Sequence, residues 1–191
     1  MEKLKGYRFG PIFTPPSKPP QSQGTLQLPS YVGGANWGSA AVDPDKGIQY
    51  VRADNFINRP LFGDGLYVNK PPYTTITAID LNKGEILWQE PNGDMPAIRN
   101  NPLLKGVSFP PTGAFGRAGP MVTAGGLVFI GAEDKKIYAR DKDNGKVIWA
   151  GDLKYPAGGN PMTYRTRSGK QFVVVATGNA KDSTLVAFAL P

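Results

Sequence analysis

The sequence predicts an all-β protein of repeated four-stranded antiparallel sheets, that is, an incomplete β-propeller. First, the phrase "AIDLNKGEILW" (78–88) returns as "ARDKDNGKVIW" (139–149), with Ala, Asp, Gly and Trp at matching offsets. Second, short runs rich in Val, Ile, Thr, Tyr and Phe alternate with turns, and the 191 residues include 24 Gly and 19 Pro. Such a mixture is typical of many short strands rather than of helices. Third, each copy of the phrase closes a unit in which four strands can be identified.

The chain begins with a Pro- and Gly-rich segment, residues 1–35, which contains "FTPPSKPPQSQGTLQLPSYVGG". Proline lacks the N–H that a helix interior needs and its ring collides with the preceding turn, so this segment is not a helix. It is also long for a passive connection, and connections of this length tend to be functional.

The strands expected after this segment fall into three units. The first unit contains strands at 36–42, 48–53, 74–79 and 85–89, and the second contains strands at 119–123, 127–131, 136–140 and 146–150. The third unit has only three strands, at 161–165, 171–176 and 184–189. The predicted organisation is therefore about two and three-quarter blades: a blade at 36–91, a loop at 92–117, a blade at 118–151 and a partial blade at 152–191.

The repeated phrase has a physical meaning in its Asp and Gly. The Asp carboxylate accepts hydrogen bonds from backbone N–H groups ahead of it, and Gly four residues later takes the positive φ that closes the turn. We expect Trp88 and Trp149 to anchor each sheet against its neighbour, with the small Ala78 and Ala139 leaving room for the rings. The same Asp-to-Gly spacing occurs at three places, namely Asp43 to Gly47, Asp80 to Gly84 and Asp141 to Gly145.

Composition excludes several functional classes. The net charge of +7 comes from 22 basic and 15 acidic residues that are scattered along the chain, so no basic stripe for nucleic acid is expected. The absence of Cys and His excludes disulfides, Cys or His metal sites and a histidine general base. No apolar run reaches the roughly 18 residues of a membrane span, and the N-terminus lacks the apolar region of an export signal.

Several longer stretches resemble the quinoprotein dehydrogenases, eight-bladed propellers that use pyrroloquinoline quinone (PQQ). The phrase A-x-D-x-x-x-G-x-x-x-W resembles their tryptophan-docking motif. The longer stretches follow the family order over nearly the whole chain and are similar to the C-terminal third of the glucose and quinate branch. They include "GYRFGPIFTPPS", "GTLQLPSYVGGANWGSAAVDPDKG", "PPYTTITAIDLNKGEILWQEPNGD", "GRAGPMVTAGGLVFIGAEDKKIYARDKDNGKVIW" and "NPMTYRTRSGKQFVVVATG".

The resemblance implies where the chemistry lies. In the family the last blade borrows its outer strand from the N-terminal part of the polypeptide. The catalytic Asp, the Ca²⁺ ligands and a quinone-contacting Lys also lie upstream of the matching region. We therefore expect no catalytic or metal-ligating residue in this chain: Asp43, Asp80 and Asp141 are assigned to turns, as are Glu133 and Asp134.

The segment "GGANW" is the predicted cofactor contact. Gly33 and Gly34 let the backbone approach a flat ligand, the Asn36 amide can donate to a quinone oxygen, and Trp37 can pack against the ring. From the residues alone, a turn-capping Asn36 and a core-aromatic Trp37 are favoured over a cofactor contact, since a single Asn-Trp pair has little specificity. The resemblance matches both to the family's Asn-Trp pair at the cofactor.

Two other features of the sequence bear on binding. Arg117 in "FGRAGP" could reach an anionic cofactor carboxylate or be an exposed loop arginine. A dinucleotide site is excluded, because "GGANWG" is followed by a strand rather than a helix.

Two hypotheses about function follow. The first is the C-terminal portion of a periplasmic PQQ-dependent dehydrogenase that oxidises a sugar or alcohol with Ca²⁺ bound elsewhere, passes electrons to membrane quinone or a cytochrome, and is inactive as an isolated fragment. The alternative is a non-enzymatic propeller scaffold resembling the lipoproteins of outer-membrane assembly. The segments "FTPPS" and "GGANWG" favour the enzyme, since a scaffold has no need of them. A truncated or split-gene product is compatible with the first hypothesis, and open sheet edges predict association with a second copy or a complementary chain.

Overall fold

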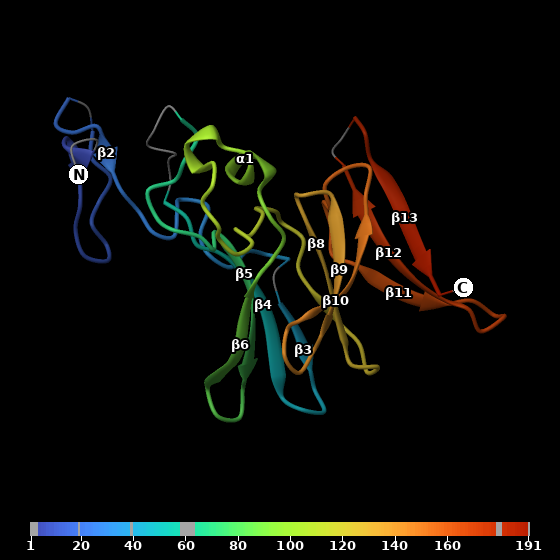
Figure 1. The fold of residues 1–191 in the computed structure, drawn as a ribbon. Helices are drawn as coiled ribbons and strands as arrows, with labels where there is room; N and C mark the ends of the chain where they lie inside the picture. Colours follow the sequence, from blue (N-terminus) through green and yellow to red (C-terminus); the bar gives the residue numbers. More distant parts are fainter. Residues whose placement is uncertain (1–3, 19, 39, 58–63, 179–180, 191) are drawn as a thin grey trace.

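Three antiparallel sheets form the body of the protein in the computed structural model, which describes residues 4–18, 20–38, 40–57, 64–178 and 181–190 (Figure 1). In each sheet, consecutive strands are neighbours. The first sheet contains β3 (Ala40–Asp43), β4 (Ile48–Asp54), β5 (Thr74–Asp80) and β6 (Glu85–Pro91). The second contains β7 (Met121–Val122), β8 (Leu127–Ala132), β9 (Lys136–Asp141) and β10 (Val147–Asp152). The third contains β11 (Met162–Arg165), β12 (Gln171–Thr177) and β13 (Thr184–Ala189).

This arrangement confirms the predicted incomplete propeller, with two four-stranded sheets and one three-stranded sheet. The innermost strands, however, are shorter than expected. β3 begins at Ala40 rather than at residue 36, and β7 spans only Met121–Val122. The Oδ1 atom of Asn36 accepts the Trp37 N–H at 2.8 Å, so a side chain rather than a neighbouring strand satisfies this donor. The "GGANW" segment is therefore a loop that leads into the first sheet.

The Asp-to-Gly turns have the predicted chemistry. Asp43 Oδ1 accepts the N–H groups of Asp45 and Lys46, and the two later copies accept N–H groups in the same way through Asp80 and Asp141. The glycines that close the three turns have positive φ angles, namely Gly47 at 65°, Gly84 at 71° and Gly145 at 75°.

Trp88 links the first sheet to the second. Its indole Nε1 donates to the Lys142 carbonyl at 3.1 Å, and its ring lies so close to Gly145 that a Cβ there would be 2.5 Å from the ring. Within its own sheet Trp88 is paired with Ala78, the small residue that was predicted to leave room for its ring. The repeated turn thus provides a carbonyl acceptor and a glycine surface for the tryptophan of the preceding sheet.

Trp149 occupies the equivalent place in the second sheet, paired with Ala139, but its partner differs. Its ring meets Phe188 of the third sheet edge to face, with centroids 5.2 Å apart, and it remains 41% exposed. Both tryptophans therefore pack on the next sheet, and only Trp88 packs on a closed Asp-to-Gly turn.

Two buried clusters fill the space between the sheets. The first joins the first two sheets, and its members are Ile48, Tyr50, Ile76, Ala78, Val128 and Ile130. The second joins the second and third sheets, and its members are Ala118, Phe129, Ile137, Ala139, Leu153, Ala157 and Val175. A buried ion pair between Lys142 Nζ and Asp43 Oδ2, at 2.7 Å, also connects the first two sheets. Each sheet is thus held chiefly by its neighbours, as in repeat architectures.

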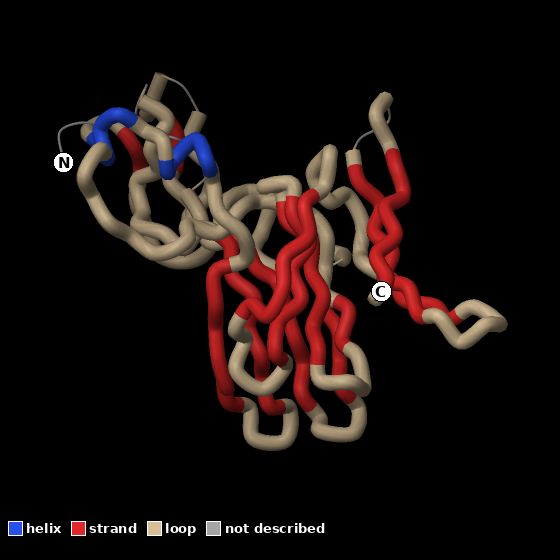
Figure 2. The backbone as a smooth tube through the Cα atoms, turned by 45° about the vertical axis from the view of Figure 1, so that its right-hand side comes forward, coloured by secondary structure: helices blue, strands red, loops and turns tan. Residues whose placement is uncertain are grey.

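The two ends of the sheets differ. The three Asp-to-Gly turns lie at the lower end in Figures 1 and 2, whereas the long connections lie at the upper end. The connection at 92–120 contains two short elements that the sequence did not predict, α1 (Pro96–Arg99) and a 3₁₀ turn at Pro102–Leu104. The N-terminal segment also holds a short parallel pair, β1 (Tyr7–Arg8) and β2 (Gly24–Thr25).

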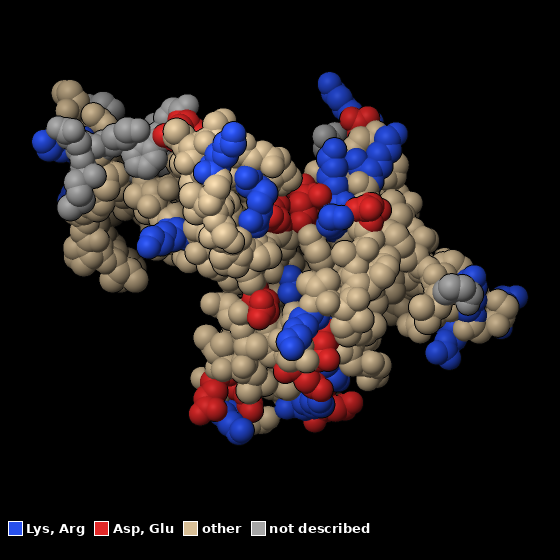
Figure 3. Space-filling model, viewed as in Figure 1, with Lys and Arg blue, Asp and Glu red and all other residues tan. Residues whose placement is uncertain are grey.

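The charged side chains on the visible surface are of both signs. Lys and Arg are interspersed with Asp and Glu over the face shown in Figure 3. Within the described residues, neither short helix has the length or apolar character needed to cross a membrane.

Replacing the two tryptophans tests their unequal roles. We expect Trp88→Ala to lower the free energy of unfolding by about 2 kcal/mol, less than the ~3–5 kcal/mol typical of a fully buried Trp because the side chain is half-buried. Trp149→Ala should cost about half as much, since its ring is more exposed and makes no docking hydrogen bond to a turn. Urea unfolding followed by circular dichroism measures both. Equal losses would contradict this account.

Candidate functional site

Three loops that enter the innermost strands come together at one end of the protein. Residues 33–38 lead into β3, residues 113–119 into β7 and residues 158–161 into β11. β3 and β7 lie in contact with each other, as inner strands of neighbouring propeller blades do. The loops ahead of these strands are therefore brought together although they are far apart in the sequence.

Gly38 marks the closest approach of the three loops. A Cβ at Gly38 would lie 2.8 Å from the Arg117 carbonyl oxygen and 2.8 Å from Asn160 Oδ1, so only glycine fits without a shift. Asn160 Oδ1 also accepts the Gly119 N–H at 2.7 Å. One amide of the third sheet thus fixes the loop of the second sheet beside that of the first.

Sequence reasoning missed Asn160. A signal for it was present: Asn160 directly follows Gly158 and Gly159, Asn36 follows Gly33 and Gly34 after one alanine, and both precede an innermost strand. This repetition is weaker than that of the Asp-to-Gly turns at the opposite end of the sheets.

Trp37 and Asn36 lie in the first of these loops. The Trp37 side chain is 75% exposed, so it does not serve as a core aromatic within the described residues. Because Asn36 Oδ1 accepts the Trp37 N–H, the amide is held by the loop's own backbone. Arg117, from the second loop, is also exposed.

Gly34 connects its loop to the first sheet. Its carbonyl accepts the Asp54 N–H at 2.9 Å, which ties the loop to the end of β4. A Cβ at Gly34 would meet Asp54 O and Pro29 Cγ at 3.6 Å, which is ordinary contact. Gly33 has a positive φ of 82°, which favours glycine at that position. Gly34 has no such backbone angle, so its conformation does not require glycine.

A polar network shapes the connection that carries Arg117. Asp94 Oδ1 accepts both the N–H and the hydroxyl of Thr112, at 2.9 and 2.8 Å. Arg99 donates to Asp94 Oδ2 at 2.8 Å and to the carbonyls of Phe109 and Pro110. The connection is thereby folded back on itself before it reaches residue 117.

Gly113 follows this network and passes directly over β5. A Cβ there would lie 2.2 Å from Thr74 O, and its φ is 74°, so only glycine is compatible with the crossing. The polar network and this close crossing together set the path of the loop that ends in Arg117.

The charge of Asp94 is part of this network. Burial raises the pKa of Asp94, but the hydrogen bonds from Arg99 and Thr112 outweigh burial and hold the net pKa below its usual range. The folded connection therefore favours the ionised carboxylate, and its stability is present above the ordinary Asp pKa and is lost as the pH falls through the folded value.

The acids of the described residues do not form a metal centre. Within that part of the chain, no group of three or more His, Cys, Asp or Glu side chains is placed to hold a metal ion. Glu133 and Asp134 lie in the turn between β8 and β9, as predicted, and Asp134 Oδ2 accepts the Asp94 N–H at 2.9 Å.

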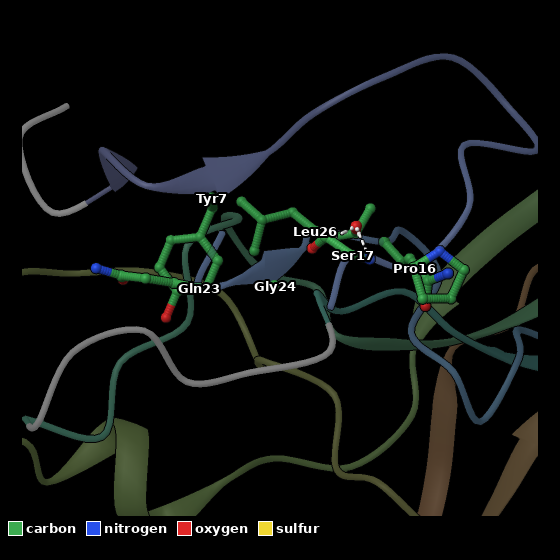
Figure 4. A pocket seen from close by; sticks show the side chains of 8 residues that line it. Tyr7, Pro16, Ser17, Gln23, Gly24 and Leu26 are labelled. Atoms are coloured by element: carbon green, nitrogen blue, oxygen red, sulfur yellow. Dashed lines mark hydrogen bonds between the residues drawn. The ribbon is translucent and has the colours of Figure 1, made fainter. Parts of the chain in front are cut away.

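The N-terminal segment forms a small pocket of about 150 Å³, shown in Figure 4. Tyr7, Gln23 and Leu26 line it, and Ser17 donates its N–H to Thr25 Oγ1 at 3.0 Å. The Thr25 hydroxyl also donates to Ser17 Oγ at 3.1 Å, so these two residues of the pocket bind each other. The lining residues of this pocket include no Asp, Glu, Lys or Arg.

The joined loops suit a flat anionic ligand. An exposed indole offers a planar apolar surface, a carboxamide offers a neutral donor, and a guanidinium offers a charge-assisted donor for carboxylates. Such a donor set fits PQQ, a planar quinone that carries carboxylates, without any acid of the loops opposing it.

Comparison with known proteins identifies the family of this chain. The family model described as "PQQ: Glucose/ethanol/alcohol dehydrogenase, beta-propeller domain" matches residues 1–62 and 56–173. The glycerol dehydrogenase large subunit of Gluconobacter thailandicus is 34% identical over 94% of this chain and 31% of its own length. The quinate/shikimate dehydrogenase (quinone) of Acinetobacter baylyi is 30% identical over 98% of this chain and 28% of its own. The quinoprotein glucose dehydrogenase of Escherichia coli is 30% identical over 96% and 28%.

Solved structures agree in fold. A europium-containing methanol dehydrogenase aligns with 77% of this chain and 25% of its own, at 25% identity and a TM-score of 0.52. The quinohemoprotein alcohol dehydrogenase ADHIIG of Pseudomonas putida HK5 aligns with 81% and 24%, at 21% identity and a TM-score of 0.54. The chain thus spans about a third or less of the length of these proteins.

The Asp94 network gives a pH-dependent prediction. We expect Asp94→Asn to expose the 92–117 connection to proteolysis several-fold faster at neutral pH, because a neutral amide loses the charge-assisted bond to Arg99. The unsubstituted protein should show the same increase as the pH falls through the acid range, where Asp94 takes up a proton. Limited proteolysis with mapping of the cut sites measures both.

Asp152→Asn is the matched control, because Asp152 pairs with Lys136 at the surface with its own side chain 87% exposed. That substitution should leave the cutting rate unchanged. Equal protection of the connection in Asp94→Asn would show that the network does not hold it.

Proposed function

The chain belongs to the β-propeller family of PQQ-dependent glucose, ethanol and alcohol dehydrogenases, and we propose that it supplies the C-terminal part of the cofactor-binding face of such an enzyme. The observation that carries this proposal is the meeting of the 33–38 and 113–119 loops at Gly38. That contact gathers Asn36, Trp37 and Arg117 at one end of the sheets.

Each of these residues has a defined role in the proposal. When bound, PQQ supplies a quinone that accepts two electrons from an alcohol or sugar hydroxyl carbon. The Asn36 amide donates to a cofactor oxygen, and the exposed Trp37 ring covers the edge of the bound group and keeps water away from it. Arg117 neutralises a cofactor carboxylate. Gly34 holds the loop to the end of β4 through its carbonyl.

The catalytic base and the metal ligands belong, in this proposal, to the rest of the enzyme. The acids assigned to turns hold backbone N–H groups, and this chain covers about a third of its curated relatives. We propose Ca²⁺ as the metal, a periplasmic location, and membrane quinone or a cytochrome as the electron acceptor. The relatives described above are all dehydrogenases, which favours an enzyme over a binding scaffold.

Removal of the Asn36 amide tests the cofactor contact. In the complete enzyme that contains these blades, Asn36→Ala should weaken PQQ binding about 3- to 10-fold, the value of one neutral hydrogen bond. Equilibrium dialysis against PQQ measures this directly. Asn144→Ala, in the turn at the opposite end, is the matched control and should bind PQQ normally. Unchanged affinity in Asn36→Ala would refute the assigned contact.

The isolated chain provides a second test. With added PQQ and Ca²⁺, the 191-residue chain should not oxidise glucose, because the proposed base and metal ligands are not among its residues. A dye-linked assay on the purified chain measures turnover. Glucose-dependent dye reduction above the protein-free rate would overturn the division of roles.

Among the residues that the structure describes, β13 at the edge of the third sheet has a neighbouring strand on one side only. We propose that this edge pairs with a strand of the complementary polypeptide or of a second copy, since an unpaired edge is a template for strand addition. Light scattering should give a mass above that of the 20.5 kDa monomer. A monodisperse monomer at micromolar concentration would contradict the proposal.

A further inference from the structure

The connection between β4 and β5 lies beside the joined loops. We call its described residues, 55–57 and 64–73, the rim loop. At its start, the Asp54 N–H donates to the Gly34 carbonyl, next to the Asn36 segment. At its end, the Tyr73 N–H donates to the Thr112 carbonyl at 2.6 Å, in the connection that carries Arg117. The rim loop therefore begins next to the 33–38 loop and is bonded at its end to the connection that carries Arg117.

Aromatic side chains fasten the rim loop to the Arg117 connection. The rings of Phe56 and Phe115 have centroids 4.2 Å apart, and Tyr67 meets Phe115 edge to face at 5.5 Å. Phe115 lies just ahead of Arg117 in the sequence. All three rings are only partly buried, so they keep exposed surface at this end of the protein.

The relatives are longer than this chain within the matched region. The alignments with the glycerol, quinate and E. coli glucose dehydrogenases run over 235 to 239 positions, which exceeds the 191 residues here by 44 to 48. At least that many positions hold residues of the relative alone. The two matches to the family model, 1–62 and 56–173, meet within the β4–β5 connection. Both findings are explained together if the relatives' extra residues belong to this connection.

We propose that the rim loop determines the size of the substrate, and that its shortness admits a sugar hydroxyl carried on an oligosaccharide. This inference rests on the proposed function and goes further by naming the substrate class. A loop of some 50 additional residues at the same place would cover the approach to the joined loops and leave space for a small polyol or a single sugar. Without that cover, further sugar units extend over the partly exposed rings of Phe56, Tyr67 and Phe115.

The chemistry of the rim suits such a ligand. Aromatic faces pack against the apolar C–H faces of sugar rings, while the sugar hydroxyls remain in water or meet nearby polar groups. The oxidation balances: the C–H and O–H bonds of the alcohol group together give up two electrons and two protons, and a carbonyl remains. A bound PQQ would accept the two electrons, an added two-electron dye would take them from it, and the protons would pass to water.

The first experiment uses the complete enzyme loaded with PQQ and Ca²⁺. We expect kcat/KM for cellotriose to exceed that for glucose at least tenfold, whereas E. coli glucose dehydrogenase should show the reverse order. Insertion of the relative's extra segment after Gly65, where a Cβ would meet no atom within 4 Å, should lower kcat/KM for cellotriose and leave that for glucose unchanged. Glucose preference in the unaltered enzyme would overturn the proposal.

A binding experiment without turnover separates recognition from catalysis. In the PQQ-free complete protein, calorimetry should show cellotriose bound at least tenfold more tightly than glucose. Phe115→Leu, which keeps apolar bulk but removes the ring, should weaken cellotriose binding several-fold. Phe172→Leu is the matched control, because Phe172 stacks on Tyr164 in the third sheet, and it should have no effect.

The outcomes distinguish the inference from the proposed function. Failure of the complete protein to take up PQQ would refute both. Normal PQQ uptake with equal binding of glucose and cellotriose, or with no effect of Phe115→Leu, would refute the role of the rim loop alone.

Discussion

The docking of Trp88 on the Lys142–Gly145 turn is the interaction on which the arrangement of the sheets depends. Trp88 donates a hydrogen bond to the Lys142 carbonyl and packs its ring on Gly145, and these two contacts together fix the spacing of the first and second sheets. The buried Asp43–Lys142 ion pair lies beside it, and Tyr50 donates to the same Lys142 carbonyl that accepts from Trp88. Because neighbouring sheets are fixed at this turn, their innermost strands β3 and β7 lie in contact, and the loops ahead of those strands are brought together at the other end.

The two ends of the sheets have different roles in this geometry. At the turn end, short hairpins repeat the same chemistry and contribute to stability. At the other end, long connections are free to differ between blades, as functional loops on a rigid scaffold usually are. Their shapes come from local polar networks such as Asp94–Thr112–Arg99 and from close crossings such as that of Gly113 over Thr74. A propeller site assembled this way draws on several blades, and the chain spans about a third of the relatives' length. In the proposed function it therefore contributes one sector of a larger face.

The sequence was most informative where structure is decided locally. The repeated phrase predicted the turns at Gly47, Gly84 and Gly145 and the pairing of Trp88 with Ala78, because an Asp-to-Gly turn needs only a few adjacent residues. It was less informative at the innermost strands, where β3 starts at Ala40 and the Asn36 side chain takes over a backbone donor. Alternation of apolar residues does not reveal such a competition between a side chain and a strand.

The sequence by itself determined the class of fold and the family, because both follow from repeated local phrases and their order along the chain. Only the tertiary structure decided that Asn160, in the loop before the third sheet, joins the loops of the first two sheets, and that the rim loop packs on Phe115. These contacts join residues that lie tens of positions apart in the chain. Their formation depends on how the sheets pack against each other, and a local pattern of residues does not determine which distant residues that packing brings together.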